Sequence, residues 1–311
     1  MLRSYRVDMP QSNPKTVLLG ATDNLPIGQL IPWAASARDS GFAGDIWLVV
    51  YRPNWVEADF EAFCAKYDIN VYPVDHDSFG NPIQHSVVGS PTSSHNLRFY
   101  HFWELLTRLK KDGVEYKYVL STDTRDVVFQ KDPSEHILEC LELPTGWSYI
   151  ISSEQITYDN EEWGKNNIIQ GFGQLMYDLH EMGDKEIFNV GVIAGKYDDM
   201  VSLYEEIYNY THDRKYYPSD QSSYNYILLH RWGKFSSSKY AIQCGTTMDP
   251  TKSFLWKRIP HYEDIEPQIK DGKVYTADNI LSAIVHQWDR VPELVKIITE
   301  KYNVQDSYRR S

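Results

Sequence analysis

Apolar, β-branched runs alternate along this chain with segments whose apolar residues recur at helical spacing. Strands are expected at Thr16–Gly20, Asp45–Tyr51 and Asn70–Pro73, with helices at Pro26–Ser40 and Asn54–Tyr67 between them. A chain that opens with strand, helix, strand, helix and strand is typical of an α/β fold of the Rossmann kind. The pattern therefore predicts a sheet that is flanked by helices.

The helical pattern continues through the rest of the chain. A helix is predicted at Asn96–Lys110, because Phe99, Phe102, Leu106 and Leu109 fall on one face. Further helices are predicted at Asn167–Met182, Asp198–His212, Asp220–Trp232 and Pro292–Tyr302. The long polar segment Asp75–Ser94 is expected to be a loop, either a plain surface excursion or a segment that closes over substrate.

A chain of 311 residues is long enough for one large α/β domain or for two ordinary ones. We favour a single main domain over residues 15–290. Residues 1–14 would form an N-terminal extension, and residues 291–311 a C-terminal helix and tail. The last part of that tail, 305–311, is expected to be frayed.

One apolar run ends abruptly in two carboxylates, Asp123 and Asp126. Open α/β sheets bind their ligands at the carboxyl ends of such strands. Two carboxylates from one short turn can share a hard divalent cation, with water and substrate phosphates as further ligands. The alternative is that Asp123 caps a turn and Asp126 is solvated. Asp132, followed by Pro133, is better explained as a helix N-cap than as a metal ligand.

The run resembles the metal-binding motif of GT-A-fold, nucleotide-sugar-dependent glycosyltransferases, in which a strand ends in Asp-x-Asp. Thr124 stands here at the first acidic position and Asp126 at the second, so Asp123 would substitute from one residue upstream. This Asp-x-x-Asp form is similar to the collagen lysyl hydroxylase-type glycosyltransferase domains and to small glycosyltransferases of large algal viruses. The resemblance implies a GT-A, Rossmann-like mixed sheet flanked by helices.

Later segments follow in the order that the resemblance requires, and the match spans roughly Thr16 to Trp288. They are Tyr149–Glu154, Phe188–Gly195 with an Asn-x-Gly pattern, Ser219–Gln221 with an Asp-Gln helix start, and Ala283–His286. The resemblance implies Mn²⁺ or Mg²⁺ as the cofactor, with Asp123, Asp126 and His286 as its ligands. A lone His at such a place is also compatible with a purely structural role.

The donor would be bound on the same side of the sheet. Arg98 precedes the carboxylate strand, where its guanidinium would bridge the diphosphate or hold Asp123; a surface ion pair is the alternative. By analogy of fold, the base of the donor would lie near Thr22, with Tyr51 following the second strand. The donor that the resemblance implies is a nucleotide sugar, most simply a UDP-linked one.

The resemblance names four more residues for the sugars. Asn189 and Gln221 would contact the donor or acceptor, and Glu154 and Asp220 are the catalytic candidates. A carboxylate must deprotonate the acceptor hydroxyl in an inverting transferase, whereas a retaining one need not use the same arrangement. The sequence ranks neither carboxylate above the other, and Asp220 has a structural alternative at a helix N-terminus.

Composition and charge limit the partners. The formal net charge of −12 argues against nucleic acid or an anionic membrane surface as the main partner. The expected partners are a nucleotide sugar and a glycan or other hydroxyl acceptor, and the 23 Tyr and 9 Trp offer rings on which sugars stack. Without a signal-peptide core or a membrane-length apolar stretch, a cytoplasmic location is predicted. Cys64, Cys140 and Cys244 are expected to be reduced.

Two other functions stay open. A non-catalytic glycan-binding module would explain the aromatic residues, although it has no need of a carboxylate pair with a late His. A phosphatase of the haloacid-dehalogenase type also begins from a strand that ends in Asp. It requires a second Asp two residues further on, where this chain has Arg125.

Overall fold

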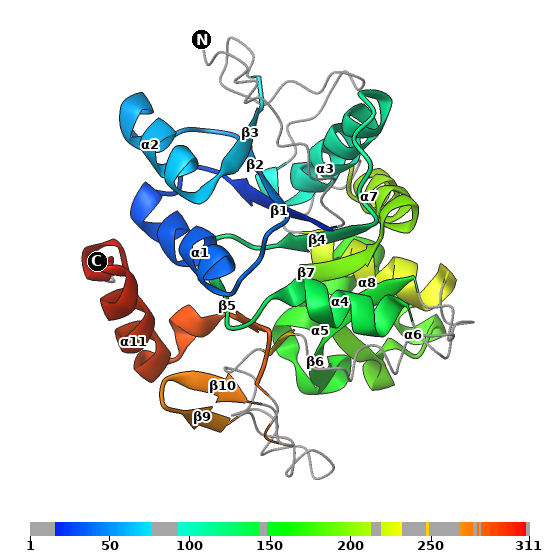
Figure 1. Cartoon of the computed structure of the whole chain (residues 1–311). Helices are drawn as coiled ribbons and strands as arrows, with labels where there is room; N and C mark the ends of the chain where they lie inside the picture. The colour runs from blue at the N-terminus through cyan, green and yellow to red at the C-terminus, as the bar shows by residue number, and fades with distance from the viewer. Residues whose placement is uncertain are drawn as a thin grey trace.

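The structure, a computed structural model, describes residues 16–75, 93–142, 148–212, 219–231, 247–248, 268–275, 279 and 281–308. In this part of the chain the central sheet has six strands in the order β3-β2-β1-β4-β7-β6. The strands are β1 (Thr16–Thr22), β2 (Asp45–Val50), β3 (Ile69–Pro73), β4 (Tyr118–Thr122), β6 (Tyr149–Thr157) and β7 (Glu186–Lys196). The predicted α/β class, with a mixed sheet between helices, is confirmed (Figure 1).

Each face of the sheet is covered by helices because side chains alternate along every strand. In β1, Val17 and Leu19 pack into one apolar cluster, and Leu18 packs into the cluster on the opposite face. The first cluster includes α3 (Ser94–Lys111), α7 (Tyr197–Thr211) and α8 (Asp220–Arg231). The second includes α1 (Ile27–Asp39), α2 (Glu57–Tyr67) and α4 (Pro133–Leu141).

Strand direction determines where polar side chains gather. Strands β3, β2, β1 and β4 run parallel, whereas β7 is antiparallel to both β4 and β6. The carboxyl ends of β1, β2, β4 and β6 therefore share one edge with the amino-terminal half of β7. The crevice between β1 and β4, where successive strands are added in opposite directions, is the usual ligand site of such sheets.

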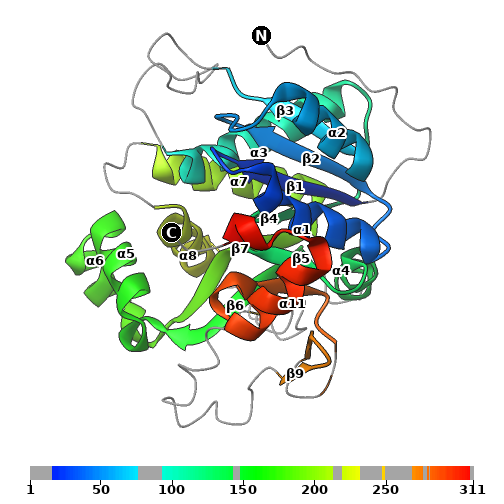
Figure 2. The same ribbon diagram turned by 90° about the vertical axis from the view of Figure 1, so that its left-hand side faces the viewer.

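A second, smaller sheet lies beside the first. Its order is β5-β11-β8, from β5 (Val127–Phe129), β11 (Ile284–His286) and β8 (Thr247–Met248). The C-terminal region continues through η3 (Trp288–Arg290), α11 (Pro292–Tyr302) and η4 (Gln305–Tyr308). In both views this region lies beside α1 (Figures 1 and 2). A hairpin, β9 (Gln268–Lys270) and β10 (Lys273–Tyr275), lies at the edge of the molecule (Figure 1).

Most predicted elements are confirmed, including the Asp132 cap, whose carboxylate accepts a hydrogen bond from the Ser134 amide at 2.8 Å. The single helix predicted at Asn167–Met182 is wrong. The chain forms α5 (Glu162–Phe172) and α6 (Gln174–Leu179), which are separated by Gly173 at φ 91°. Only glycine adopts such a conformation readily, so the helix ends there.

The frayed tail is also wrong as far as it can be followed, because residues 305–308 form η4 and pack on the domain. Residues 1–14, most of the loop Asp75–Ser94, and Cys244 lie outside the described residues. The division of the chain into extension, domain and tail stays a prediction. None of the described helices combines the length and apolar character needed to cross a membrane.

Candidate metal and donor site

The loop that follows β4 carries both aspartates and is tied to its neighbours by main-chain contacts. The Asp123 amide donates to the Gly191 carbonyl at 2.7 Å, which continues the pairing of β4 with β7. Thr124 is buried, and its hydroxyl donates to the Ala21 carbonyl at the end of β1 at 2.8 Å. Thr124 therefore anchors the loop to β1. The side chains of Asp123 and Asp126, before and after it in the chain, line the cavity beside the loop.

His286 reaches the aspartates through the small sheet. Strand β11 runs antiparallel to β5 with His286 opposite Val127, the residue that follows Asp126. Just after the histidine, Gln287 takes a left-handed conformation at φ 60°, and its amide donates to the Asp126 carbonyl at 2.8 Å. A residue from the end of the chain is thus fixed beside the loop after β4.

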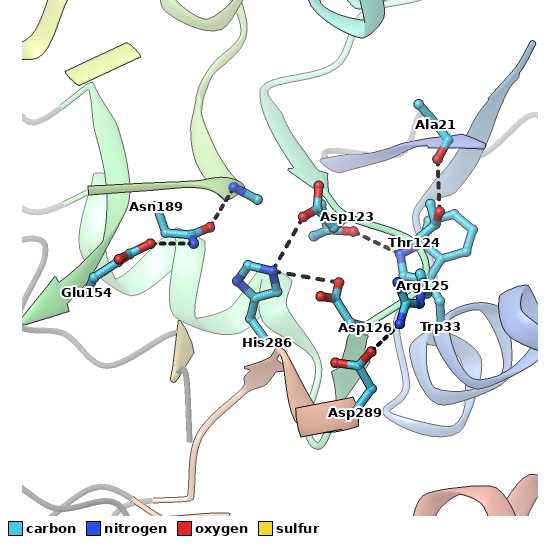
Figure 3. A network of polar contacts seen from close by, with 12 residues as sticks. Ala21, Trp33, Asp123, Thr124, Arg125, Asp126, Glu154, Asn189, His286 and Asp289 are labelled. Carbon is cyan, nitrogen blue, oxygen red and sulfur yellow. Dashed lines mark hydrogen bonds and ion pairs between the residues drawn. The ribbon is translucent and has the colours of Figure 1, made fainter. Parts of the chain in front are cut away.

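The three predicted metal ligands converge. His286 Nε2 lies 3.4 Å from Asp123 Oδ2 and 3.7 Å from Asp126 Oδ1 (Figure 3). One ligand atom from each residue fits within 4.8 Å of the other two. The imidazole is buried, whereas the side chains of Asp123 and Asp126 are 31% and 17% exposed. Two oxygens and one nitrogen that lie this close together, with both carboxylates partly exposed, could hold a divalent metal ion.

The two carboxylates differ in their proton affinity. Burial disfavours the charged form of Asp123, but Arg98 and His286 attract it more strongly and hold its pKa below the ordinary value. Burial, with repulsion from Asp123 and Asp289, raises the pKa of Asp126 to about 6 despite the attraction of His286. The positive charge around Asp126 is therefore too small to stabilise its ionised form fully, and a divalent cation would supply more.

Gly191 makes this approach possible. A Cβ at this position would stand 2.6 Å from His286 Cε1, 2.7 Å from Asp123 Oδ2 and 2.8 Å from Asn189 Oδ1. Real Cβ atoms essentially never come so close to other heavy atoms. The glycine of the Asn-x-Gly pattern therefore leaves room for two of the three predicted ligands.

Arg98 connects the loop to α8. Its guanidinium donates to Asp123 Oδ1 through Nη1 and to Asp220 Oδ2 through Nη2, the latter at 3.1 Å. The Arg98 side chain is 11% exposed and that of Asp220 is 7% exposed, so this is a buried bridge and not the surface pair considered as the alternative. Asp220 also accepts the Gln221 amide at the start of α8, at 2.9 Å.

Glu154 and Asn189 lie on the other side of His286 from the two aspartates (Figure 3), and together with Gln221 they form a second polar cluster. Glu154 Oε1 accepts hydrogen bonds from Asn189 Nδ2 at 3.0 Å and Gln221 Nε2 at 3.3 Å. Asn189 Oδ1 in turn accepts the Gly191 amide at 2.6 Å. These three residues are buried, and Asn189 lies beside Gly191 together with Asp123 and His286.

A cavity of about 290 Å³ opens beside the carboxylates. Thr22 and Tyr51 line it at the ends of β1 and β2, Asp123 and Asp126 line it just after β4, and Arg98 lines it from α3. The Tyr51 hydroxyl is 2.8 Å from His101 Nδ1, which fixes the ring in the wall. The predicted donor-binding residues fall into two groups, because Asn189 and Gln221 are not among those that line this cavity.

Some contributors carried no recognisable sequence signal. Asn225 lies on α8 and brackets the start of β7, accepting the Phe188 amide at 2.8 Å and donating to its carbonyl at 2.7 Å. Asp289 binds Arg125 at 2.7 Å, so the arginine between the two aspartates is paired with a residue from η3. Tyr308 reaches the same loop from the C-terminal end. The polar break after His286 was the only hint of Asp289.

No protein-family model and no curated protein sequence matches the chain. Among solved structures it is similar to the galactosyltransferase LgtC in complex with donor and acceptor sugar analogues. The identity is 14% and the TM-score 0.46, over 95% of this chain and 97% of that one. The bifunctional glycosyltransferase WbbM is 14% identical with a TM-score of 0.42, over 70% of this chain and 38% of WbbM.

A glycosyltransferase involved in the glycosylation of the major capsid of PBCV-1 is also similar. It is 12% identical with a TM-score of 0.40, over 93% of this chain and 100% of that one. Each of these solved structures is a glycosyltransferase. The likeness to the collagen lysyl hydroxylase type stays a prediction.

Proposed function

We propose that this protein is a metal-dependent glycosyltransferase of the GT-A type, which transfers a sugar from a nucleoside diphosphate, most simply UDP, to a hydroxyl of a glycan or other acceptor. One observation carries the proposal. The Asp123, Asp126 and His286 ligand atoms converge within 4.8 Å of one another, and both aspartates line a cavity of about 290 Å³. A carboxylate-rich cation site that opens into a nucleotide-sized cavity suits a diphosphate ester.

The reaction explains why a cation is needed. As the glycosyl bond breaks, negative charge builds on the departing diphosphate, and Mn²⁺ or Mg²⁺ supplies positive charge at that point. The protein has few cations of its own there, because Arg98 is engaged by Asp123 and Asp220 and Arg125 by Asp289. An overall charge of −12 adds to this need.

The residues around the site would divide the remaining tasks. Thr22 and Tyr51 would border the base, since they line the end of the cavity formed by β1 and β2. Asn189 and Gln221 would bind sugar hydroxyls, with Glu154 held between their amides. Of the two catalytic candidates, Asp220 is paired with Arg98 and would act through it, as a positioning residue. Glu154 would be the carboxylate that contacts the sugars.

Calorimetric titration with Mn²⁺ and UDP tests this function against its rivals. A glycosyltransferase should bind UDP in a metal-dependent manner, lose that dependence on Asp126→Ala, and slowly hydrolyse one member of a panel of nucleotide sugars. A glycan-binding module would show no metal-dependent nucleotide affinity. A phosphatase would hydrolyse a generic phosphoester such as p-nitrophenyl phosphate, and either result would overturn the proposal.

A further inference from the structure

The C-terminal turn η4 contacts the loop that carries the two aspartates. The Tyr308 hydroxyl lies 2.7 Å from the carbonyl oxygen of Arg125 and 2.9 Å from that of Gln29. A phenol has one proton to donate, so the two carbonyls share it. Through this contact the turn joins α1 to the peptide unit that links Arg125 to Asp126.

The same turn also touches the histidine side of the site. The Tyr308 ring packs on Trp288, two residues after His286, with centroids 4.9 Å apart. Trp288 is fully buried in a cluster that includes Val128 and Val285, from β5 and β11. Tyr308 therefore contacts both chain segments that bring the predicted ligands together.

Two further contacts hold the turn in place. Gln29 Nε2 donates to the Ser307 carbonyl at 2.8 Å. Ser307 lies so close to α1 that a Cβ at Gly28 would stand 1.9 Å from its Oγ and 2.9 Å from its Cβ. Burial, with the nearby Asp289 carboxylate, raises the pKa of Tyr308, so the hydroxyl keeps its proton and stays a donor.

We propose that Tyr308 is a positioning residue of the metal site, which fixes the loop between Asp123 and Asp126 by holding the Arg125 carbonyl. The inference rests on the proposed function, because it takes the aspartates as metal ligands. Outer contacts that orient metal ligands commonly contribute 10- to 100-fold to affinity.

Tyr308→Phe removes the hydroxyl and keeps the ring on Trp288. We expect the Mn²⁺ dissociation constant, measured by calorimetry, to rise about 10-fold. In metal-free protein, hydrogen exchange of a peptide that covers residues 123–127 should accelerate. Tyr302→Phe is the matched control, since it removes another C-terminal phenol hydroxyl, one that lies 3.4 Å from Asp39 Oδ2. It should leave both measurements unchanged.

Gly28→Ala tests the same contact from α1 without touching Tyr308. Alanine favours the helix more than glycine does, yet its Cβ must displace Ser307. We expect Mn²⁺ affinity to fall as in Tyr308→Phe while the helix is not weakened. Combining Gly28→Ala with Ser307→Gly removes the clash and should restore the wild-type dissociation constant.

The outcomes separate this inference from the proposed function. If the wild type binds no Mn²⁺, the proposed function fails, and unchanged exchange in Tyr308→Phe would refute the positioning role as well. If the wild type binds Mn²⁺ and Tyr308→Phe binds it equally tightly, the positioning role alone is wrong. A lower melting temperature without a change in Mn²⁺ affinity would show that the hydroxyl is merely structural.

Discussion

Gly191 and His286 are so close that no side chain fits between them: a Cβ on the glycine would stand 2.6 Å from the imidazole Cε1. Gly191→Ala should therefore push His286 and Asp123 apart. We expect Mn²⁺ affinity to fall at least about 10-fold, with an overpacking cost of roughly 1–3 kcal/mol in the free energy of unfolding.

Calorimetry with Mn²⁺ and chemical denaturation measure the two effects. Gly171→Ala in α5 is the matched control, because its new Cβ meets only the side chain of Ser222. An unchanged Mn²⁺ dissociation constant in Gly191→Ala would show that the metal does not bind between His286 and Asp123.

Metal affinity should depend on pH through Asp126. Its pKa is raised to about 6 in the metal-free protein, and a cation has to displace the proton that the carboxylate holds below this value. We expect the Mn²⁺ affinity to be nearly constant above about pH 7 and to fall by up to about 10-fold per pH unit below 6. Titrations at a series of pH values test this, and an affinity that does not change between pH 7 and 5 would contradict it.

The same carboxylate should lower stability when no metal is present. The folded-state pKa of about 6 lies above the ordinary value of 3.8, so the folded protein holds the proton more tightly than the unfolded chain. The protonated carboxylate contributes to the free energy of unfolding. This contribution is fully present below about pH 4 and is lost as the pH rises through about 6. In EDTA at pH 7.5, Asp126→Asn should stabilise the protein by on the order of 1–3 kcal/mol, and a loss of stability in denaturant titration would contradict this.

The amide variants of Glu154 and Asp220 should differ. Glu154→Gln should keep UDP and Mn²⁺ affinity within about threefold and lower turnover about 100-fold or more, as expected of a group that acts in the transition state. Asp220→Asn leaves Arg98 with Asp123 as its remaining carboxylate partner, so the arginine competes with the metal and Mn²⁺ affinity should fall as well. Equal effects of both variants on binding and turnover would contradict the division of roles.

Much of the fold could be predicted from the sequence because its signals are local. The apolar alternation in β1 and the helical spacing in α3 each report which face is buried, and Asp132 with Pro133 marks a helix start. The break between α5 and α6 was missed because a single glycine within a helical pattern does not by itself predict a helix end. Gly173 ends the helix through its positive φ, which the sequence does not reveal.

The site was only partly predictable for a similar reason. Asp123 and Asp126 lie three positions apart in one short turn, and His286 was found through the order of motifs. His286 lies on β11, whose partner strand β5 has only three residues and therefore no periodic pattern that would predict the pairing. Tyr308 is a single aromatic residue in a polar segment, and its importance depends on contacts with Arg125 and Gln29 that are far apart in the chain.

Anomalous X-ray scattering at the manganese edge, from crystals grown with Mn²⁺ and UDP, tests the central claim most directly. The account predicts one strong peak about 2 Å from Asp123 Oδ2, Asp126 Oδ1 and His286 Nε2, with the UDP phosphates beside it in the cavity. A manganese peak elsewhere, or UDP bound in the cavity with no metal between these three residues, would contradict it.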